Sequence, residues 1–158
     1  MTSVDISAEK ERYTNHVAEF RRRVFVPGSL DDVREFVHDD VVDHFAPDDD
    51  PGGVAGFAKR FSSAKAALKA HEIEVVASSY DGDVLFQAIL LKFEHTGEFM
   101  GMKATGKRFA IGGMDAFRFR DGKIAEHWGV YDVSKIPDLL VGTGESPGGW
   151  STMWPKPE

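Results

Sequence analysis

The residues best suited to chemistry lie near the end of the chain, in the stretch DGKIAEHWGVYD at residues 121–132. The opening Asp-Gly pair is typical of a hairpin turn, and the residues after it have the pattern of a β-strand. Because side chains alternate across a strand, His127, Gly129 and Tyr131 share one face. An imidazole and a phenol on one face can exchange protons with a bound molecule. This face is therefore either a reactive site or the polar wall of a pocket.

Other catalytic and ligand-binding motifs are incomplete in this sequence. The 158-residue chain has no cysteine, which excludes disulfides, thiolate metal sites and a cysteine nucleophile. Its six histidines show no zinc-binding spacing, and no GxSxG nucleophile elbow is present. The segment GMKATGK at residues 101–107 begins like a phosphate-binding loop, but Arg108 replaces the required Ser or Thr and a strand follows. We therefore expect neither a metal ion nor a phosphate-binding loop.

The composition narrows the partners that the protein can have. A formal net charge of −7 argues against unassisted binding of nucleic acid. No apolar run reaches the roughly 18 residues of a membrane span, and the polar N-terminal segment lacks the apolar centre of a secretion signal. The lack of cysteine suits the reducing cytoplasm, where we expect the protein. The length fits one domain, residues 1–158, with a tail rich in Gly, Pro and Trp at residues 143–158.

Two runs of like charge are interpreted as surface features. The basic run at residues 21–23 is expected on the solvated face of the first helix. The acidic run at residues 48–50 lacks the alternating oxygen ligands of a calcium loop, so we expect a solvated loop there. At the end of this run, Asp50 before Pro51 is typical of a helix N-cap followed by the first helical residue.

The elements that must position these residues change in type at His71. Before it, apolar residues at helical spacing predict helices over residues 8–26, after Ser29 and from Pro51. After it, period-two alternation predicts strands, which cover residues 72–79, 83–95, 106–120 and 123–132. Helices followed by a strongly curved antiparallel sheet indicate an α+β fold, a cone whose apolar interior can hold a small molecule. A Gly pair at residues 112–113 is expected to form a bulge or kink that adds curvature.

The sequence resembles the SnoaL-like polyketide cyclases over roughly residues 10–142. The resemblance lies mainly in HTGEFMGMKATGKRFAIGGMDAFRFRDGKIAEHWGVYD, residues 95–132, which contains a TGE-GM-TG hairpin, an apolar strand, DGKI and a strand with His and Trp. His44, in VVDHF, matches a position where members of that family often have His or Asn. The resemblance implies the cone-shaped α+β fold of nuclear transport factor 2 and ketosteroid isomerase, in agreement with the elements above.

The family implies acid–base chemistry without a cofactor on a small, largely apolar, polyketide-like carbonyl compound. In its aromatic-polyketide cyclases, a carboxylate removes a proton from a carbon between carbonyls, and the carbanion closes a ring by aldol addition. The catalytic Asp of those enzymes falls on Gly129 here, their His falls on Asp115 and their Gln falls on Gly113. The usual carboxylate is therefore absent, and the family mechanism does not carry over unchanged.

The resemblance places Asp115 on the cavity side of its strand, where it can meet His127 across the last hairpin. We predict that Asp115 is the general base, with its pKa raised by burial, and that His127 takes part in catalysis. Alternatively, Asp115 forms a structural ion pair with Arg118, Arg108 or His127, and His127 is only a pocket wall or a structural residue. The predicted substrate-binding residues are His44, Phe45, Met102, Phe117, Gly129 and Tyr131.

The alternatives extend to single residues and to the function as a whole. A tyrosine at such a position is more often a core residue than a donor, and His44 can be a turn residue that only bonds the backbone. The leading hypothesis is a cyclase or isomerase. The others are a related hydroxylase or hydrolase, and a binding module without catalysis.

The outward face of the last strands is expected to contact a second copy of the chain. It is apolar, with Met114, Ala116, Trp128 and Val130, and strict alternation also places Ile124 there. We therefore expect a homo-oligomer, either a dimer or a tetramer. The tail with its two Trp residues is expected to dock on the same or a neighbouring subunit.

Overall fold

The computed structural model describes residues 3–26, 30–141 and 151–152. The expected docking of the tail at residues 143–158 concerns residues that lie mostly outside these ranges. The helices are α1 (Ser3–Phe20), continued by a π-helical turn (Arg21–Phe25), a 3-10 turn (Leu30–Asp32), α2 (Val33–Phe36), α3 (Gly53–Ala67), a second 3-10 turn (Val133–Lys135) and α4 (Ile136–Val141). None of the described helices is long and apolar enough to cross a membrane.

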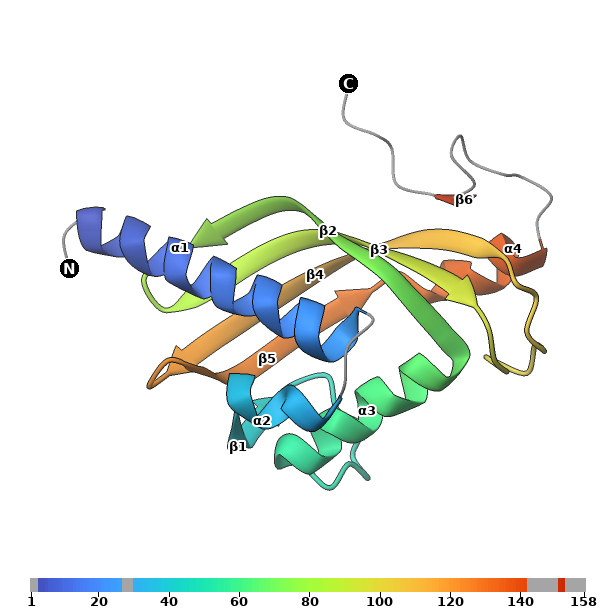
Figure 1. The fold of residues 1–158 in the computed structure, drawn as a ribbon, viewed down its shortest axis with the longest axis horizontal. Helices are drawn as coiled ribbons and strands as arrows, with labels where there is room; N and C mark the ends of the chain where they lie inside the picture. Colours follow the sequence, from blue (N-terminus) through green and yellow to red (C-terminus); the bar gives the residue numbers. More distant parts are fainter. Residues whose placement is uncertain (1–2, 27–29, 142–150, 153–158) are drawn as a thin grey trace.

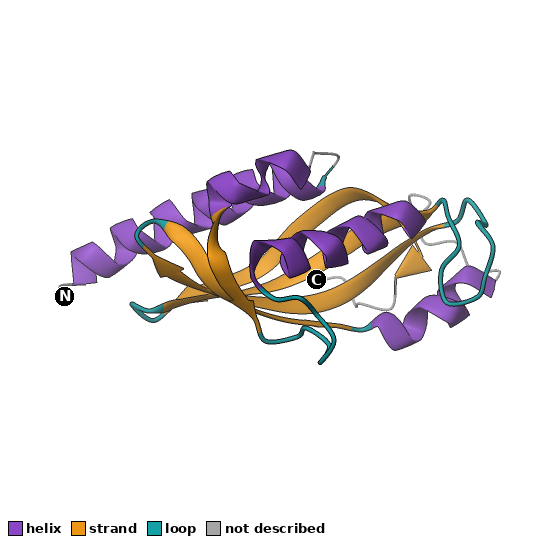
Figure 2. Cartoon of the chain, turned by 90° about the horizontal axis from the view of Figure 1, so that it is seen from below, coloured by secondary structure: helices purple, strands orange, loops and turns teal. Residues whose placement is uncertain are grey.

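One mixed sheet forms the centre of the fold. The strands are β1 (Val37–Asp43), β2 (Leu68–Tyr80), β3 (Val84–His95), β4 (Arg108–Arg120), β5 (Lys123–Tyr131) and β6 (Ser151–Thr152). They follow the order β1-β5-β4-β3-β2, and β6 pairs with β4 off this path. The chain from β2 to β5 is antiparallel, but β1 runs parallel to β5, so the predicted purely antiparallel sheet is wrong at this edge. Figures 1 and 2 show α1 and α3 packed over one face of the sheet, which confirms the α+β class.

Two helix boundaries differ from the prediction. The second helix ends at Phe36, and the following residues form β1, which buries Val37 and Val41 against the helices. The third helix begins at Gly53 with Gly52 as its N-cap, so the predicted N-cap at Asp50 is wrong. Asp50 instead accepts a hydrogen bond from the Gly52 N–H at 2.8 Å, because the chain turns at Gly52 with a φ of 73° that suits glycine.

The core has two parts, and the cavity described below lies beside both. The apolar stripe predicted for the first helix packs into the first part, through Tyr13, Val17 and Phe20 of α1 and Val24 of the π-helical turn. The second part joins β3, β4 and α4, with Phe93, Phe109 and Ile136 at its centre. Close packing of aromatic rings in both parts makes the sheet a rigid support for the side chains on its concave face.

A β-bulge near the last hairpin decides which residues face the core. Arg118 pairs with Glu126 and Phe119 with Ile124, so Ala125 is the extra residue. The bulge turns Ile124 into the core, where its exposure is 0%. The predicted outward position of Ile124 is therefore wrong, because strict alternation does not hold across a bulge.

The two glycines of β4 do not form a bulge, and Gly113 serves packing. Within the described strands, β3 and β4 pair through Gly112 and Gly113 without a shift in register, so the predicted bulge is wrong. A Cβ on Gly113 would lie 2.5 Å from Cδ1 of Tyr131, closer than side-chain atoms approach. The absence of a side chain at this position makes room for the Tyr131 ring.

The outer face of the sheet carries exposed apolar side chains. Met114 and Val130 are 58% and 61% exposed on adjacent strands, where they are paired neighbours. An exposed apolar area of this kind suits contact with another protein surface. The homo-oligomer expected from this face stays a prediction.

Candidate active site

A cavity of about 290 Å³ lies between the concave face of the sheet and the helices. Most of its wall is apolar and aromatic, with Phe20, Phe61, Phe93 and Phe117 among the lining residues. The polar lining residues are Arg21, Asp43, Arg60, Asp115, His127 and Tyr131. A largely apolar cavity with a few convergent polar groups is typical of a small-molecule site.

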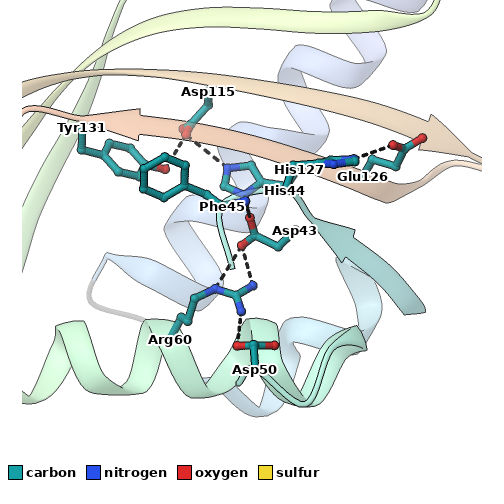
Figure 3. Close-up of polar contacts among 9 residues, drawn as sticks. All are labelled: Asp43, His44, Phe45, Asp50, Arg60, Asp115, Glu126, His127 and Tyr131. Carbon is teal, nitrogen blue, oxygen red and sulfur yellow. Dashed lines mark hydrogen bonds and ion pairs between the residues drawn. The ribbon is translucent and has the colours of Figure 1, made fainter. Parts of the chain in front are cut away.

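Asp115, on β4, contacts three other polar residues of the cavity wall, and Figure 3 shows two of them, Tyr131 and His127. Its Oδ2 accepts a hydrogen bond from Arg21 at 2.8 Å. Its Oδ1 accepts one from the Tyr131 hydroxyl at 2.5 Å and another from His127 Nε2 at 3.3 Å. Phe117 pairs with His127 in the register of β4 and β5, so Asp115 and His127 meet on a diagonal, as predicted. The carboxylate is 6% exposed and held by three donors.

The position of Arg21 corrects the prediction that residues 21–23 form a solvated face. Its side chain is 8% exposed and pairs with Asp115, and it also donates to Gln87 Oε1 at 2.7 Å. Arg21 lies four residues after Val17 and three before Val24, which places it within the buried stripe of the helix. A π-helical turn begins at this residue, and such turns are frequent at functional sites.

The neighbouring charges change the pKa of Asp115 in the direction opposite to our prediction. Burial, the largest single influence, raises the pKa of this carboxyl group. The hydrogen bond and charge of His127, the charge of Arg21 and the hydrogen bond from Tyr131 together outweigh burial, so the pKa is lowered. The predicted raised pKa is therefore wrong, and Asp115 is ionised at neutral pH.

His127, on β5, is enclosed between two carboxylates. Its Nε2 is 3.3 Å from Asp115 Oδ1, and its Nδ1 is 3.4 Å from Asp43 Oδ1. The second contact is an ion pair without the geometry of a hydrogen bond. Phe117 stacks on the ring with centroids 5.0 Å apart, and Phe57 meets it edge-on at 5.6 Å. Burial lowers the pKa of His127, but the two carboxylates raise it further, to about 9, so the ring is an imidazolium at neutral pH.

Asp43 and Arg60 belong to the same polar group and were not predicted. Asp43, the last residue of β1, accepts hydrogen bonds from the Phe45 N–H at 3.0 Å and from Arg60 Nε at 3.2 Å. Arg60, on α3, also pairs with Asp50, which corrects the solvated position predicted for that residue. Burial raises the pKa of Asp43, but His127 and the other donors lower it to about 2. Alternation in VVDHF would have indicated that Asp43 and His44 point to opposite faces.

His44 points away from the cavity, contrary to its predicted place among the substrate-binding residues. Its ring stacks on Trp128 at 4.3 Å, and its Nε2 contacts Glu126 Oε2 at 2.7 Å (Figure 3). His44 follows Asp43, and Trp128 follows His127. Because Asp43 and His127 face inward, the side chains of the next residues lie on the outer face. His44, the residue after β1, therefore contacts β5 on that face.

The other predicted binding residues are divided. Phe45 and Phe117 line the cavity, as does Tyr131. Met102 packs against the second part of the core and is not among the described lining residues. Gly129 lies beneath the Tyr131 hydroxyl, which is 2.6 Å from where a Cβ would be.

No group of three His, Asp or Glu side chains in the described ranges is arranged to hold a metal ion. The acidic groups of the cavity are matched by cationic partners instead. Arg21 faces Asp115, Arg60 faces Asp43, and His127 lies between the two carboxylates. The arrangement can transfer protons and stabilise a developing negative charge on a bound molecule.

Comparison with known proteins places this geometry in a family. The family model of the SnoaL-like polyketide cyclases matches residues 15–137. The aklanonic acid methyl ester cyclase DnrD of Streptomyces peucetius is 33% identical over 137 residues, covering 83% of this chain and 86% of that protein. DauD of Streptomyces sp. (strain C5), with the same description, is 30% identical over 134 residues, covering 82% and 83%.

Solved structures have the same fold. IdmH, a putative polyketide cyclase from Streptomyces antibioticus, superposes with a TM-score of 0.67 at 27% identity over 80% of this chain and 96% of that one. TsrD from Streptomyces laurentii superposes with a TM-score of 0.72 at 17% identity over 83% and 96%, a likeness of fold alone. The match of the family model over most of the chain, with two curated relatives of at least 30% identity, shows that this chain belongs to the SnoaL-like polyketide cyclase family.

Proposed function

We propose that the protein is a cofactor-free cyclase that closes a ring in a polyketide-like carbonyl compound by intramolecular aldol addition. The observation that carries this proposal is the group formed by Asp115, His127 and Tyr131 at the wall of an otherwise apolar cavity. Relatives described as aklanonic acid methyl ester cyclases support the same class of reaction.

The cavity favours a neutral, largely apolar substrate. Its aromatic wall suits a planar ring system, because stacked and edge-on contacts with Phe side chains stabilise such rings. Arg21 and Arg60 both have carboxylate partners, so neither is free to pair with an acidic group of the substrate. An ester with acidic carbon positions fits these conditions.

In the proposed first step, the Asp115 carboxylate takes a proton from a carbon that lies between two carbonyls. The C–H electron pair becomes the enolate, and Asp115 becomes the neutral acid. A carboxylate with a lowered pKa is a weak base, but two carbonyls make the carbon acidic, and the His127 imidazolium beside it stabilises the enolate charge. Protonation of Asp115 also releases the Tyr131 O–H, which then donates to the enolate oxygen.

In the second step, the enolate carbon attacks a ketone carbon of the same molecule. A carbon–carbon bond forms, and the electron pair of the ketone C=O moves to its oxygen. The resulting alkoxide takes back the proton that Asp115 holds, which restores the resting carboxylate. The product has the same mass as the substrate, so the reaction is also an isomerisation.

A second candidate function is small-ligand binding without catalysis. The observation that favours it is the saturation of Asp115, whose two oxygens already accept hydrogen bonds from Arg21, Tyr131 and His127. In this second candidate function, Asp115 orders the wall of the cavity and does not react. The absence of a carboxylate at Gly129 points in the same direction.

The decisive experiment is turnover of aklanonic acid methyl ester, the compound named by the curated relatives. Wild type, Asp115→Asn and the control Asp40→Asn would be compared, because Asp40 is an exposed carboxylate on β1, at the outer end of an ion pair with Arg120. We expect ring closure by wild type and control, and a loss on the order of 10²- to 10⁴-fold in Asp115→Asn. Chromatography follows the reaction, since the mass does not change.

The other outcomes separate the proposals. Equal turnover by Asp115→Asn would remove Asp115 as the base and keep the cyclase. Saturable binding of the ester by wild type without any conversion, seen as quenching of protein fluorescence, would select the binding function. If wild type neither binds nor converts the ester, this compound is excluded as the ligand.

A further inference from the structure

The pairing of β1 with β5 brings Asp43 and His127 together. The two residues are direct partners in this parallel pair, and the His44 N–H donates to the His127 carbonyl at 2.9 Å. Both side chains point to the concave face, while the next residues, His44 and Trp128, stack on the outer face. Contacts on both faces of the sheet therefore keep Asp43 next to His127.

Asp43 is held by groups other than His127. The Phe45 N–H bonds Oδ1 at 3.0 Å, and Arg60 bonds Oδ2 through Nε at 3.2 Å and Nη2 at 2.5 Å. Arg60 is fixed in turn by Asp50, whose carboxylate fills the space left by Gly56: a Cβ there would be 1.9 Å from Asp50 Oδ1. The position of Asp43 is thus set from α3 and its preceding loop, independently of the histidine ring.

Aromatic packing restricts the rotation of the His127 ring, in addition to its contacts with the two carboxylates. Phe117 covers one side and Phe57 meets the ring edge-on. The charged groups around it are Asp43 from β1 and Asp115 from β4. Behind these, Arg60 from α3 faces Asp43, and Arg21 from the π-helical turn and Tyr131 from β5 face Asp115. Asp115 faces Nε2 of the ring and shares its oxygens with Arg21 and Tyr131. Asp43 is the carboxylate that faces the other ring nitrogen, Nδ1.

We propose that Asp43 is a positioning residue, which keeps His127 doubly protonated and directs its Nε2–H toward Asp115 and the cavity. The inference rests on the proposed function, in which the His127 imidazolium stabilises the enolate. Asp43 acts through His127 and is not required to touch the reacting atoms.

The test is the titration of the His127 ring, followed by NMR of the side-chain nitrogens in the full-length protein. In wild type we expect an imidazolium up to a pKa of about 9. Asp43→Asn should lower this pKa by about 1 to 3 units, the usual effect of a neighbouring opposite charge. Asp40→Asn, on the same strand but exposed, should leave it unchanged.

A second variant should shift the pKa of His127 in the opposite direction, and it keeps the test open if Asp43→Asn does not fold. Arg60→Gln removes the cation that competes with His127 for Asp43, so the pKa of His127 should rise. A merely structural role for Asp43 predicts loss of thermal stability in both variants, with no opposed shifts of the ring titration. An unchanged pKa in Asp43→Asn, or a fall in Arg60→Gln, would overturn the proposal.

Turnover adds a functional readout. The alkaline limb of the kcat–pH profile should move to lower pH in Asp43→Asn in step with the ring titration, while KM changes less. A shifted titration without a shifted limb would show that the charge on His127 is not used and would overturn the positioning role. If wild type binds the ester without converting it, the cyclase proposal fails, and the opposed titration shifts alone support or overturn Asp43 as the residue that holds the charge on His127.

Discussion

The hydroxyl of Tyr131 occupies the space that a side chain at Gly129 would need. A Cβ on Gly129 would be 2.6 Å from this oxygen, and a Cβ on Gly113 would be 2.5 Å from Cδ1 of the same ring. The two glycines therefore form a slot in which the tyrosine lies across the sheet and reaches Asp115. By resemblance, these are the positions of the catalytic Asp and the Gln of the family. This chain has a phenol where that arrangement has a carboxylate.

Restoring the carboxylate should therefore harm the protein. In Gly129→Asp the new side chain collides with Tyr131 and displaces it from Asp115. We expect a loss of about 1–3 kcal/mol in the free energy of unfolding, as for other overpacked sites, and no gain in turnover. Urea unfolding measures the first and ring closure the second. Val42→Asp, at an exposed position of the neighbouring strand β1, is the control. A Gly129→Asp variant that is more active than wild type and equally stable would contradict this account of the slot.

Arg21 should be far more important for stability than Arg22, the residue beside it. Arg21→Met removes one of the two cations beside the buried Asp115 and leaves only His127, and breaking a buried pair costs about 3–5 kcal/mol. Arg22→Met breaks an exposed, solvent-screened pair with Glu19 and should leave stability nearly unchanged. Denaturant unfolding of the two variants makes the comparison. Equal effects would mean that the contact between Arg21 and Asp115 does not persist in solution.

Removing the Tyr131 hydroxyl should lower turnover more than stability. Tyr131→Phe keeps the ring in its slot but removes the donor to the proposed enolate, and loss of one such donor costs on the order of 10²- to 10³-fold in kcat. Tyr80→Phe is the matched control, because its hydroxyl bonds Glu9 and Tyr80 is not among the cavity-lining residues. Steady-state kinetics with the ester gives the ratio. Full activity in Tyr131→Phe would remove the hydroxyl from the mechanism.

Stability should depend on pH in two separate ranges. The pKa of His127 is raised from 6.5 to about 9, so its contribution is complete below pH 6.5 and is lost as the pH rises through about 9. The pKa of Asp43 is lowered from 3.8 to about 2, so its contribution is complete above pH 3.8 and is lost as the pH falls through about 2. Thermal unfolding across this range should show a plateau between them. His127→Gln should lack the alkaline decline, and an unchanged decline would assign it to another group.

Periodicity predicted the elements of the sheet well, since β2 to β5 are long and consecutive strands pair with each other. It failed where a local pattern depends on distant partners. β1 is short, and its partner among the described strands is β5, more than 80 residues further along the chain, so VHDDVVD offered no hairpin signal. Ile124 was misplaced because a bulge at Ala125, which alternation cannot foresee, reverses the face of the strand.

The candidate site was also predicted only where local patterns decide it, and missed where it depends on residues far apart in the sequence. Side-chain alternation along the strands and the family resemblance predicted that Asp115, His127 and Tyr131 share one face, and the structure places them together. Arg21 was misjudged because charged residues are usually solvated, and its buried partner is 94 residues away in the sequence. The pKa of Asp115 was predicted in the wrong direction for a related reason, since burial was counted and the His127 imidazolium, the Arg21 guanidinium and the Tyr131 hydroxyl were not.

Six charged groups of alternating sign run through the molecule from the π-helical turn to the loop before α3: Arg21, Asp115, His127, Asp43, Arg60 and Asp50. With His127 protonated, their formal charges sum to zero. Any single neutralisation leaves an unmatched charge in a poorly solvated place, whereas a paired loss of neighbouring opposite charges does not. The consequence is epistasis. A lineage can alter this row only by exchanging oppositely charged members together, so these positions should be inherited as a set.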